Sequence, residues 1–566
     1  MKVKLYSILA LFFAILVALS GCFAGEEANK PKEPTNNTEK PADSEEKPAD
    51  DSASTSPKVL RLNNGSEPGS LHPGTAQGTH DSWVLEHAFE GLTKKSPEGE
   101  IVEGMAEKWE TSNDGLTWTF YLRDGVTWSN GDSVTAHDFE YAWKHALNPE
   151  TASTYAYQLY YLKGGQAFNS AEEGADLQAL EDAVGVKALD EKTLEVTLEV
   201  ATPYFLDLTS FYTYYPVNKA VQEANPDWYK EADTYVSNGA FKLTEWKHKE
   251  SMKLEKNEHY YDQAKINLDE VHFVIIDDEN TVWQMYRSGE IDLVYPLPQD
   301  VQGQLLANND PEFNLGPDLA IYYYNINNDV KPFNNPKVRK ALAMAIDRET
   351  IVEHVAQGGQ TPAYSVVPPG IPDVSGDYQE NTGKLFEANA EEAKKLLAEG
   401  LAEEGMAELP PFTLTYNTSE GHKLIAEAVQ EMLRKNLGVA ITLENVEFQV
   451  KLDREKAGDY TMSRAGWVGD YVDPMTFIDL WVSDSPYNDA NWANAEYDRL
   501  VNLAKSSMDQ GERMQAMHDA EKILMDEMPI IPVYFYTKPF TVKPYVTGIY
   551  TPINRYPQFH YVDIKN

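Results

Sequence analysis

Residues 334–347 read NNPKVRKALAMAID, a stretch in which both a helix start and a helical periodicity can be recognised. Asn335 is a favourable N-cap residue, and Pro336 fits the first turn, where its missing N–H is not needed. The apolar residues that follow fall on one face: Val338, Leu342, Ala345 and Ile346. The stretch therefore predicts an amphipathic helix that packs against a core.

Helical and strand-like segments alternate along the rest of the chain. Two more amphipathic helices are predicted at 390–401 and 424–437. Three segments alternate apolar and polar residues as strands do: 193–200, 412–416 and 441–443. The run 530–536 is continuously apolar and rich in β-formers, which favours a buried strand. This alternation predicts an α/β fold.

Size and charge limit the possible functions. A chain of 566 residues is too long for one hydrophobic core, so two or three domains are expected. The formal net charge of −42 argues against nucleic acid as a partner, because phosphate binding needs a basic surface. Such acidity suits a soluble extracellular protein.

The N-terminus predicts export and anchoring. An uncharged apolar run at 5–19 follows Lys2 and Lys4, so residues 1–21 are predicted to be a signal peptide. Residues 19–22 read LSGC and resemble a bacterial lipobox, which implies that Cys22 is lipidated and becomes the mature N-terminus. Cys22 is the only cysteine, so the chain cannot form an internal disulfide. The alternative is a secreted protein with one spare thiol.

Residues 22–56 are predicted to be a disordered tether. They are rich in Glu, Lys, Pro, Asn, Ser and Asp and almost free of apolar residues, so they cannot bury enough surface to fold. A flexible tether of this length reaches roughly 30 Å. The expected location is the extracellular face of a cell membrane, in a Gram-positive bacterium.

Motifs of catalysis and metal binding are missing from the sequence. It contains no Gly-x-Ser-x-Gly, His-Glu-x-x-His or phosphate-binding loop, and its 12 histidines form no i, i+4 pair. Neither an enzyme nor a cofactor is predicted. The 33 tyrosines cluster, for example at 155–161, 212–215, 322–324 and 534–536. They can pack domain faces, or they can line a ligand cleft.

Ten collinear blocks after residue 57 resemble the solute-binding proteins of peptide ABC importers, extracellular family 5. The longest, AEKWETSNDGLTWTFYLRDGVTWSNGDSVTAHDFEYAWKHALNP, covers 106–149. The others include NNGSEPGSLHP from Asn63, SNGAFKL from Ser237 and SRAGWVGDYVDP from Ser463. The chain is most similar to the oligopeptide-binding lipoproteins of Gram-positive bacteria.

This resemblance implies a three-lobed, hinged fold of the periplasmic-binding-protein type with mixed sheets. Lobe I would comprise 57–79, 204–321 and 535–566, lobe II 80–203, and lobe III 322–534. The hinge would lie where the chain crosses near Ile321 and Phe535. The implied function is a monomeric receptor that binds oligopeptides and delivers them to ABC permease subunits. A receptor of the same fold for signalling peptides, cell-wall peptides or a non-peptide solute is the alternative.

The block that starts at Ser463 would supply the centre of the site. Asp470 matches the aspartate that binds the peptide ammonium, although it can also be read as a helix cap before Asp473. Gly466 and Val468 match positions whose backbone groups bind the peptide main chain, and glycine suits close backbone approach. Trp467 would line a side-chain pocket.

The remaining site residues are also assigned by resemblance. Arg464 and His422 match positions that meet the peptide carboxylate, although each can also form an interlobe ion pair. Glu67, Tyr155 and Tyr295 match residues that line the cleft. Two positions depart from the pattern: Ala356 stands where some members carry a carboxylate-binding lysine, and Pro296 cannot donate a backbone hydrogen bond.

Overall fold

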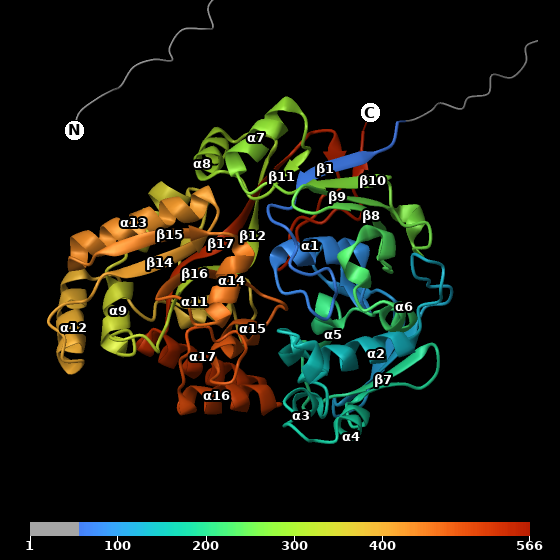
Figure 1. The fold of residues 1–566 in the computed structure, drawn as a ribbon, viewed down its shortest axis with the longest axis horizontal. Helices are drawn as coiled ribbons and strands as arrows, with labels where there is room; N and C mark the ends of the chain where they lie inside the picture. Colours follow the sequence, from blue (N-terminus) through green and yellow to red (C-terminus); the bar gives the residue numbers. More distant parts are fainter. Residues whose placement is uncertain (1–55, 566) are drawn as a thin grey trace, which may run out of the picture. The chain divides into compact units, whose positions relative to one another are not determined.

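The computed structural model describes residues 56–565, which form one compact unit (Figure 1). The predicted signal peptide, Cys22 and the predicted tether up to residue 55 lie outside the described residues. Helices and strands alternate around several mixed sheets, which confirms the predicted α/β class.

Two four-stranded sheets are built from the first part of the chain and lie on the right of Figure 1. The first has the order β1(Val59–Asn63), β10(Glu270–Val274), β9(Ser251–Lys256), β8(Phe241–Lys247), with only β1 and β10 parallel. The second is antiparallel, in the order β4(Ala106–Thr111), β5(Thr117–Leu122), β7(Thr193–Thr197), β6(Val186–Ala188). Helices α1(Thr79–Ala88) and α2(Ala136–Leu147) pack against β8 and β6, respectively.

A larger sheet of seven strands organises the other half. Its order is β11(Leu293–Val294), β17(Ile530–Val542), β12(Phe313–Ile326), β16(Met462–Val468), β14(Phe412–Asn417), β15(Ile441–Val446), with β13(Thr361–Pro362) beside β17. Strands β12 and β17 run antiparallel side by side through the middle of Figure 1. Their register shifts between Pro317 and Ile321, beside Phe535, so the long ladder is interrupted there.

Helices cover this large sheet and pack in pairs beside it. The longer ones are α7(Glu279–Ser288), α8(Gln299–Asn308), α9(Pro336–Met344), α12(Ala390–Glu403), α13(Glu420–Leu437), α14(Phe448–Lys456), α16(Ala495–Ser506) and α17(Gln510–Glu527). Helix α13 packs on β14 and β15, and α12 packs against α9 (Figure 1). Two small antiparallel pairs complete the sheets: β2(Thr93–Lys95) with β3(Ile101–Glu103), and β18(Val546–Thr547) with β19(Asp563–Ile564).

The predicted elements are present, with shifted ends. The Asn335 side chain accepts a hydrogen bond from the Lys337 N–H at 2.9 Å, so it caps α9 as predicted. That helix ends at Met344, but Ala345 and Ile346 are still buried. Helix α13 begins four residues before the predicted start because Ser419 caps it through the His422 N–H. The predicted strand at 193–200 ends at Thr197, and the one at 530–536 continues to Val542.

Candidate functional site

A cavity of about 370 Å³ lies beside the large sheet and is lined by segments from distant parts of the sequence. The wall includes β16 and β17, the loop before α1, the segment after β10, and the start of α13. This volume falls in the range of small-molecule sites, and many of the lining groups are polar.

One edge of β16 is open in this cavity. Strand β14 pairs with β16 only at Met462 and Ser463, whereas β12 follows it to Val468. The Gly469 N–H donates to the Leu319 carbonyl of β12 at 2.7 Å. Because alternate residues of an antiparallel strand face opposite edges, the backbone groups of Gly466 and Val468 are directed to the open edge. An extended chain can pair with such an edge as an added strand.

The Asp470 carboxylate lies just beyond this strand and is 3% exposed. It accepts hydrogen bonds from the Gln158 amide at 2.6 Å and from the Tyr157 hydroxyl at 3.5 Å. Burial raises the pKa of Asp470 well above its usual range, and the positive charge of Arg555 opposes this rise only in part. No cation among residues 56–565 forms an ion pair with this carboxylate, so it can receive a cationic ligand group.

The alternative reading of Asp470 as a helix cap is not supported. Asp473 takes that role, since its carboxylate accepts the Met475 N–H at 2.9 Å at the start of the short helix α15(Met475–Ile478).

Aromatic rings form the wall next to Asp470. Trp467 stacks at 6.2 Å from Tyr155 and meets Tyr487 edge to face at 4.9 Å, measured between ring centroids. All three rings line the cavity. Tyr155 comes from a segment more than 300 residues from Trp467 in sequence. The rings therefore join two sides of the cavity by apolar contact.

Arg464 carries a second charge that the described residues leave unpaired. Its guanidinium donates to the Asn417 side chain at 3.4 Å and to the Tyr536 hydroxyl at 2.5 Å, and it lies 4.7 Å from the centroid of the Tyr322 ring. A Cβ placed on Gly466 would lie 3.2 Å from Nη2 of Arg464. The guanidinium thus reaches the open edge of β16, and no acidic group of residues 56–565 pairs with it there.

His422 lies in the same wall, with its ring 5.6 Å from that of Tyr322. Burial and the nearby Arg464 lower the pKa of His422 well below its usual value, so the imidazole is neutral at pH 7. A neutral ring can donate one hydrogen bond to a carboxylate. Neither His422 nor Arg464 forms the interlobe ion pair that was the alternative, within the described part of the chain.

The other predicted cleft residues divide into two groups. Tyr295 and Pro296 line the cavity, and Tyr295 packs against Tyr556 at 4.8 Å. Glu67 does not line it: its carboxylate pairs with His248 at 2.7 Å and accepts the Lys249 N–H at 2.8 Å. The expectation for Glu67 is therefore corrected, because these contacts orient its side chain toward the turn after β8.

Sequence reasoning missed several polar residues of the wall. Gln158, Glu279, Gln299 and Arg555 all contact the cavity or its charged groups, and each is brought there by long-range topology. No local motif identifies them. Tyr323, Tyr534 and Tyr536 belong to the tyrosine clusters of the sequence and line the cavity, so the cleft interpretation applies to them.

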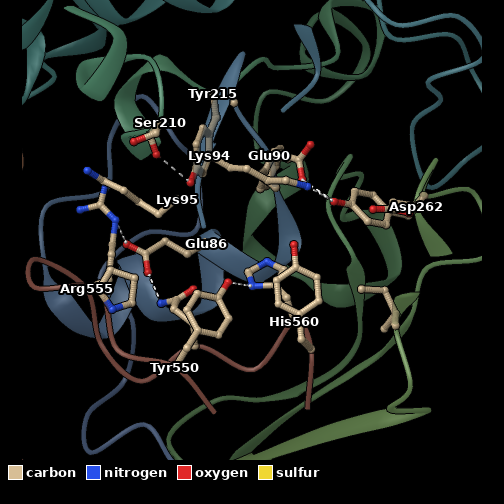
Figure 2. Close-up of a pocket in the computed structure, with 17 residues that line it drawn as sticks. Glu86, Glu90, Lys94, Lys95, Ser210, Tyr215, Asp262, Tyr550, Arg555 and His560 are labelled. Atoms are coloured by element: carbon tan, nitrogen blue, oxygen red, sulfur yellow. Dashed lines mark hydrogen bonds and ion pairs between the residues drawn. The ribbon is translucent and has the colours of Figure 1, made fainter. Parts of the chain in front are cut away.

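A second, smaller cavity of about 40 Å³ shares Glu86 and Arg555 with the large one (Figure 2). Arg555 Nε pairs with Glu86 at 3.0 Å, and Lys94 pairs with Glu90 at 3.0 Å. Its charged groups are largely satisfied by one another, and its volume suits a few water molecules. The large cavity is therefore the candidate ligand site.

Residues 56–565 contain no group of histidine and acidic side chains arranged to hold a metal ion. None of the helices there is both long and apolar enough to span a bilayer.

Comparisons with known proteins agree with this geometry. The sequence model of the bacterial extracellular solute-binding proteins, family 5 Middle, matches residues 100–489. The oligopeptide-binding protein OppA of Bacillus subtilis (strain 168) is 41% identical over 558 residues, which cover 97% of each chain.

Solved structures are similar as well. Listeria monocytogenes OppA bound to peptide superimposes with a TM-score of 0.84 at 30% identity, covering 90% of this chain and 100% of that one. A structure of the Escherichia coli murein tripeptide binding protein MppA gives 0.82 at 33% identity, covering 90% and 99%. The unliganded open form of MppA gives only 0.61 at 33% identity, covering 90% and 98%.

Proposed function

The chain belongs to the bacterial extracellular solute-binding proteins of family 5, and on this premise we propose that it is the receptor that captures oligopeptides for an ABC importer. The observation that carries the proposal is a pair of ionisable side chains in one cavity, each without an ionic partner. Asp470 and Arg464 both line this cavity, and neither has an ionic partner among residues 56–565. Arg464 belongs to β16, and Asp470 follows the end of that strand, so the open edge of β16 runs between them. A free peptide supplies the missing partners, because it carries an ammonium, a carboxylate and a backbone that can pair as a strand.

In this proposal Asp470 binds the ammonium, and Gly466 and Val468 bind the backbone. Arg464 binds the carboxylate, with His422 serving peptides of another length. Trp467, Tyr155 and Tyr295 line side-chain pockets. Hydrated side-chain pockets would suit a receptor that tolerates many sequences. The receptor itself does no chemistry and hands the peptide to permease subunits.

Closure of the lobes would bury the peptide. The proposed lobes are those given by the family resemblance, with crossings near Ile321 and Phe535. The interrupted register of β12 and β17 at these residues supports a hinge there. The lower similarity to the open form of MppA supports the view that the present arrangement is the closed one.

We also propose that the protein acts as a monomer anchored through Cys22 to the extracellular face of the cell membrane. The lipobox resemblance and the acidic, polar segment after it support this placement.

Mass spectrometry of ligands released by denaturing the purified protein tests the proposed function. The expected result is a mixture of short peptides with free termini. Recovery of only non-peptide solutes, together with no binding of a peptide mixture in calorimetry, would contradict it.

A further inference from the structure

Three acidic residues, Asp278, Glu279 and Glu420, form a corner beside the part of the cavity where Arg464 is proposed to bind the peptide carboxylate. Glu279 is the first residue of α7, and one of its oxygens accepts a hydrogen bond from the Ser419 hydroxyl at 2.8 Å. Its other oxygen contacts no donor among residues 56–565. Within that range, no lysine, arginine or histidine forms an ion pair with any of the three carboxylates.

Gln299 provides an independent observation at the same place. It lines the cavity, is 9% exposed, and donates its amide N–H to the Gly421 carbonyl at 3.4 Å. The Gln299 Oε1 atom is buried without a donor in the described part of the chain. A Cβ on Gly421 would lie 3.0 Å from Gln299 Nε2 and 3.5 Å from Ser419 Oγ, so Gln299 and Ser419 are neighbours.

The other two carboxylates already have donors, since Glu420 accepts from the Asn280 amide and Asp278 from the Thr281 N–H. The second Glu279 oxygen and Gln299 Oε1 are the acceptors at this corner that have no donor among residues 56–565. A buried acceptor without a partner is costly, and an unpaired carboxylate is more so. Burial raises the pKa of Glu279 to about 7, the nearby Glu420 and Asp278 add to the rise, and the hydrogen bond from the Ser419 hydroxyl opposes it. A donor-rich cation would satisfy the amide oxygen and the carboxylate together.

We propose that Glu279 and Gln299 form a subsite for the lysine or arginine side chain of a peptide residue at or next to the C-terminus. This rests on the proposed function. The place of this residue in the peptide follows from the path of the protein chain between Asn417 and Ser419. Asn417 contacts the Arg464 guanidinium, and Ser419, two residues later, contacts Glu279. Two residues span at most about 7 Å, which the long stem of a lysine or arginine can bridge.

Calorimetry with matched tripeptides tests the subsite. Ala-Ala-Lys is compared with the same peptide acetylated on the lysine side chain, which keeps the stem and removes the charge. The wild type should bind the charged peptide about 10- to 100-fold more tightly, as expected for a hydrogen bond to a charged group. Glu279→Gln keeps an acceptor for Ser419 and should abolish this preference while still binding the acetylated peptide.

Two controls separate the subsite from other causes. Glu98→Gln removes one charge from an exposed loop outside the cavity and should keep the preference. Lys-Ala-Ala, compared with its side-chain-acetylated form, tests whether the lysine must stand near the C-terminus of the peptide. The wild type should prefer the charged form of this peptide much less than it prefers charged Ala-Ala-Lys. Equal binding of the two Ala-Ala-Lys forms, a preference that survives in Glu279→Gln, or an equal preference at both positions would overturn the subsite. These outcomes leave the proposed function intact, whereas failure of every peptide to bind would overturn both.

Discussion

The Asp470 carboxylate accepts a hydrogen bond of 2.6 Å from the side-chain amide of Gln158, a residue 312 positions earlier in the chain. Gln158 is fully buried in the short 3-10 helix η2(Ala156–Leu159), directly after the cavity-lining Tyr155. The contact ties this segment to the end of β16, where the ligand ammonium is proposed to bind. The nearest cation, Arg555, is already paired with Glu86 and meets only the backbone carbonyl of Asp470, at 3.5 Å.

The first prediction concerns the stability of the ligand-free protein. The raised pKa of Asp470 means that the native state holds this proton more tightly than the unfolded chain does. The protonated carboxyl therefore adds to the free energy of unfolding at low pH. This stabilisation is lost as the pH rises from the unfolded pKa of about 3.9 through the higher native pKa. Asp470→Asn should raise the melting temperature of ligand-stripped protein at pH 7, measured by calorimetry. A lower melting temperature than wild type would show that the carboxylate is stabilised by the fold.

The second prediction concerns the pH dependence of binding. A peptide ammonium requires the ionised form of Asp470, so binding should release protons and weaken as pH falls toward the acidic range. Above about pH 8 the peptide amine loses its own proton, and affinity should fall again. Calorimetry in buffers of different ionisation enthalpy measures the protons released. Binding by Asp470→Asn should release none of them, and an identical release by both proteins would speak against this role.

The third prediction concerns Arg464. Replacing it by Gln removes the cation that the described residues leave unpaired, so affinity for peptides with a free carboxylate should fall roughly 10- to 100-fold. Peptide amides, which lack the carboxylate charge, should bind both proteins similarly. Arg434→Gln is the matched control, because that arginine is exposed and pairs with Glu431 on the surface. An equal loss for free and amidated peptides would place the carboxylate elsewhere.

The fourth prediction concerns the anchor, which lies outside the described residues. Cys22→Ser should prevent incorporation of labelled palmitate and release the protein into the medium, because the thiol is the proposed site of lipidation. The measurement is radiolabelling of cells that express each form. Labelled mutant protein would mean that Cys22 is not the modified residue.

Local signals made part of the fold predictable. Asn335 and Pro336 start α9 because capping depends on residues within one turn. The ends of elements were less predictable, since they depend on partners from elsewhere. Strand β17 continues six residues past the predicted end because β12 and β11 supply a ladder that the sequence alone does not reveal.

The site was predictable only in part, for the same reason. Asp470, Arg464 and Trp467 were found through one contiguous block, and all three line one cavity. Glu279 and Gln299 have no such block and reach Ser419 and Gly421 through the packing of distant segments. Glu67 lies in a block that resembles the family, but the direction of its side chain is set by His248, which is 181 positions away in the sequence.

The most direct test of peptide capture at Asp470 is calorimetry of four combinations: wild type and Asp470→Asn, each with a free and an N-acetylated peptide. Asp470→Asn leaves the buried ammonium unpaired, which costs on the order of 3–5 kcal/mol, or roughly 100- to 4000-fold in affinity. Acetylation removes the same ion pair and should also weaken binding, although the Asp470 carboxyl can then keep its proton. The ionic interaction can be lost only once, so the double change should cost much less than the sum of the two single changes. If the two losses simply add, Asp470 does not hold the peptide ammonium.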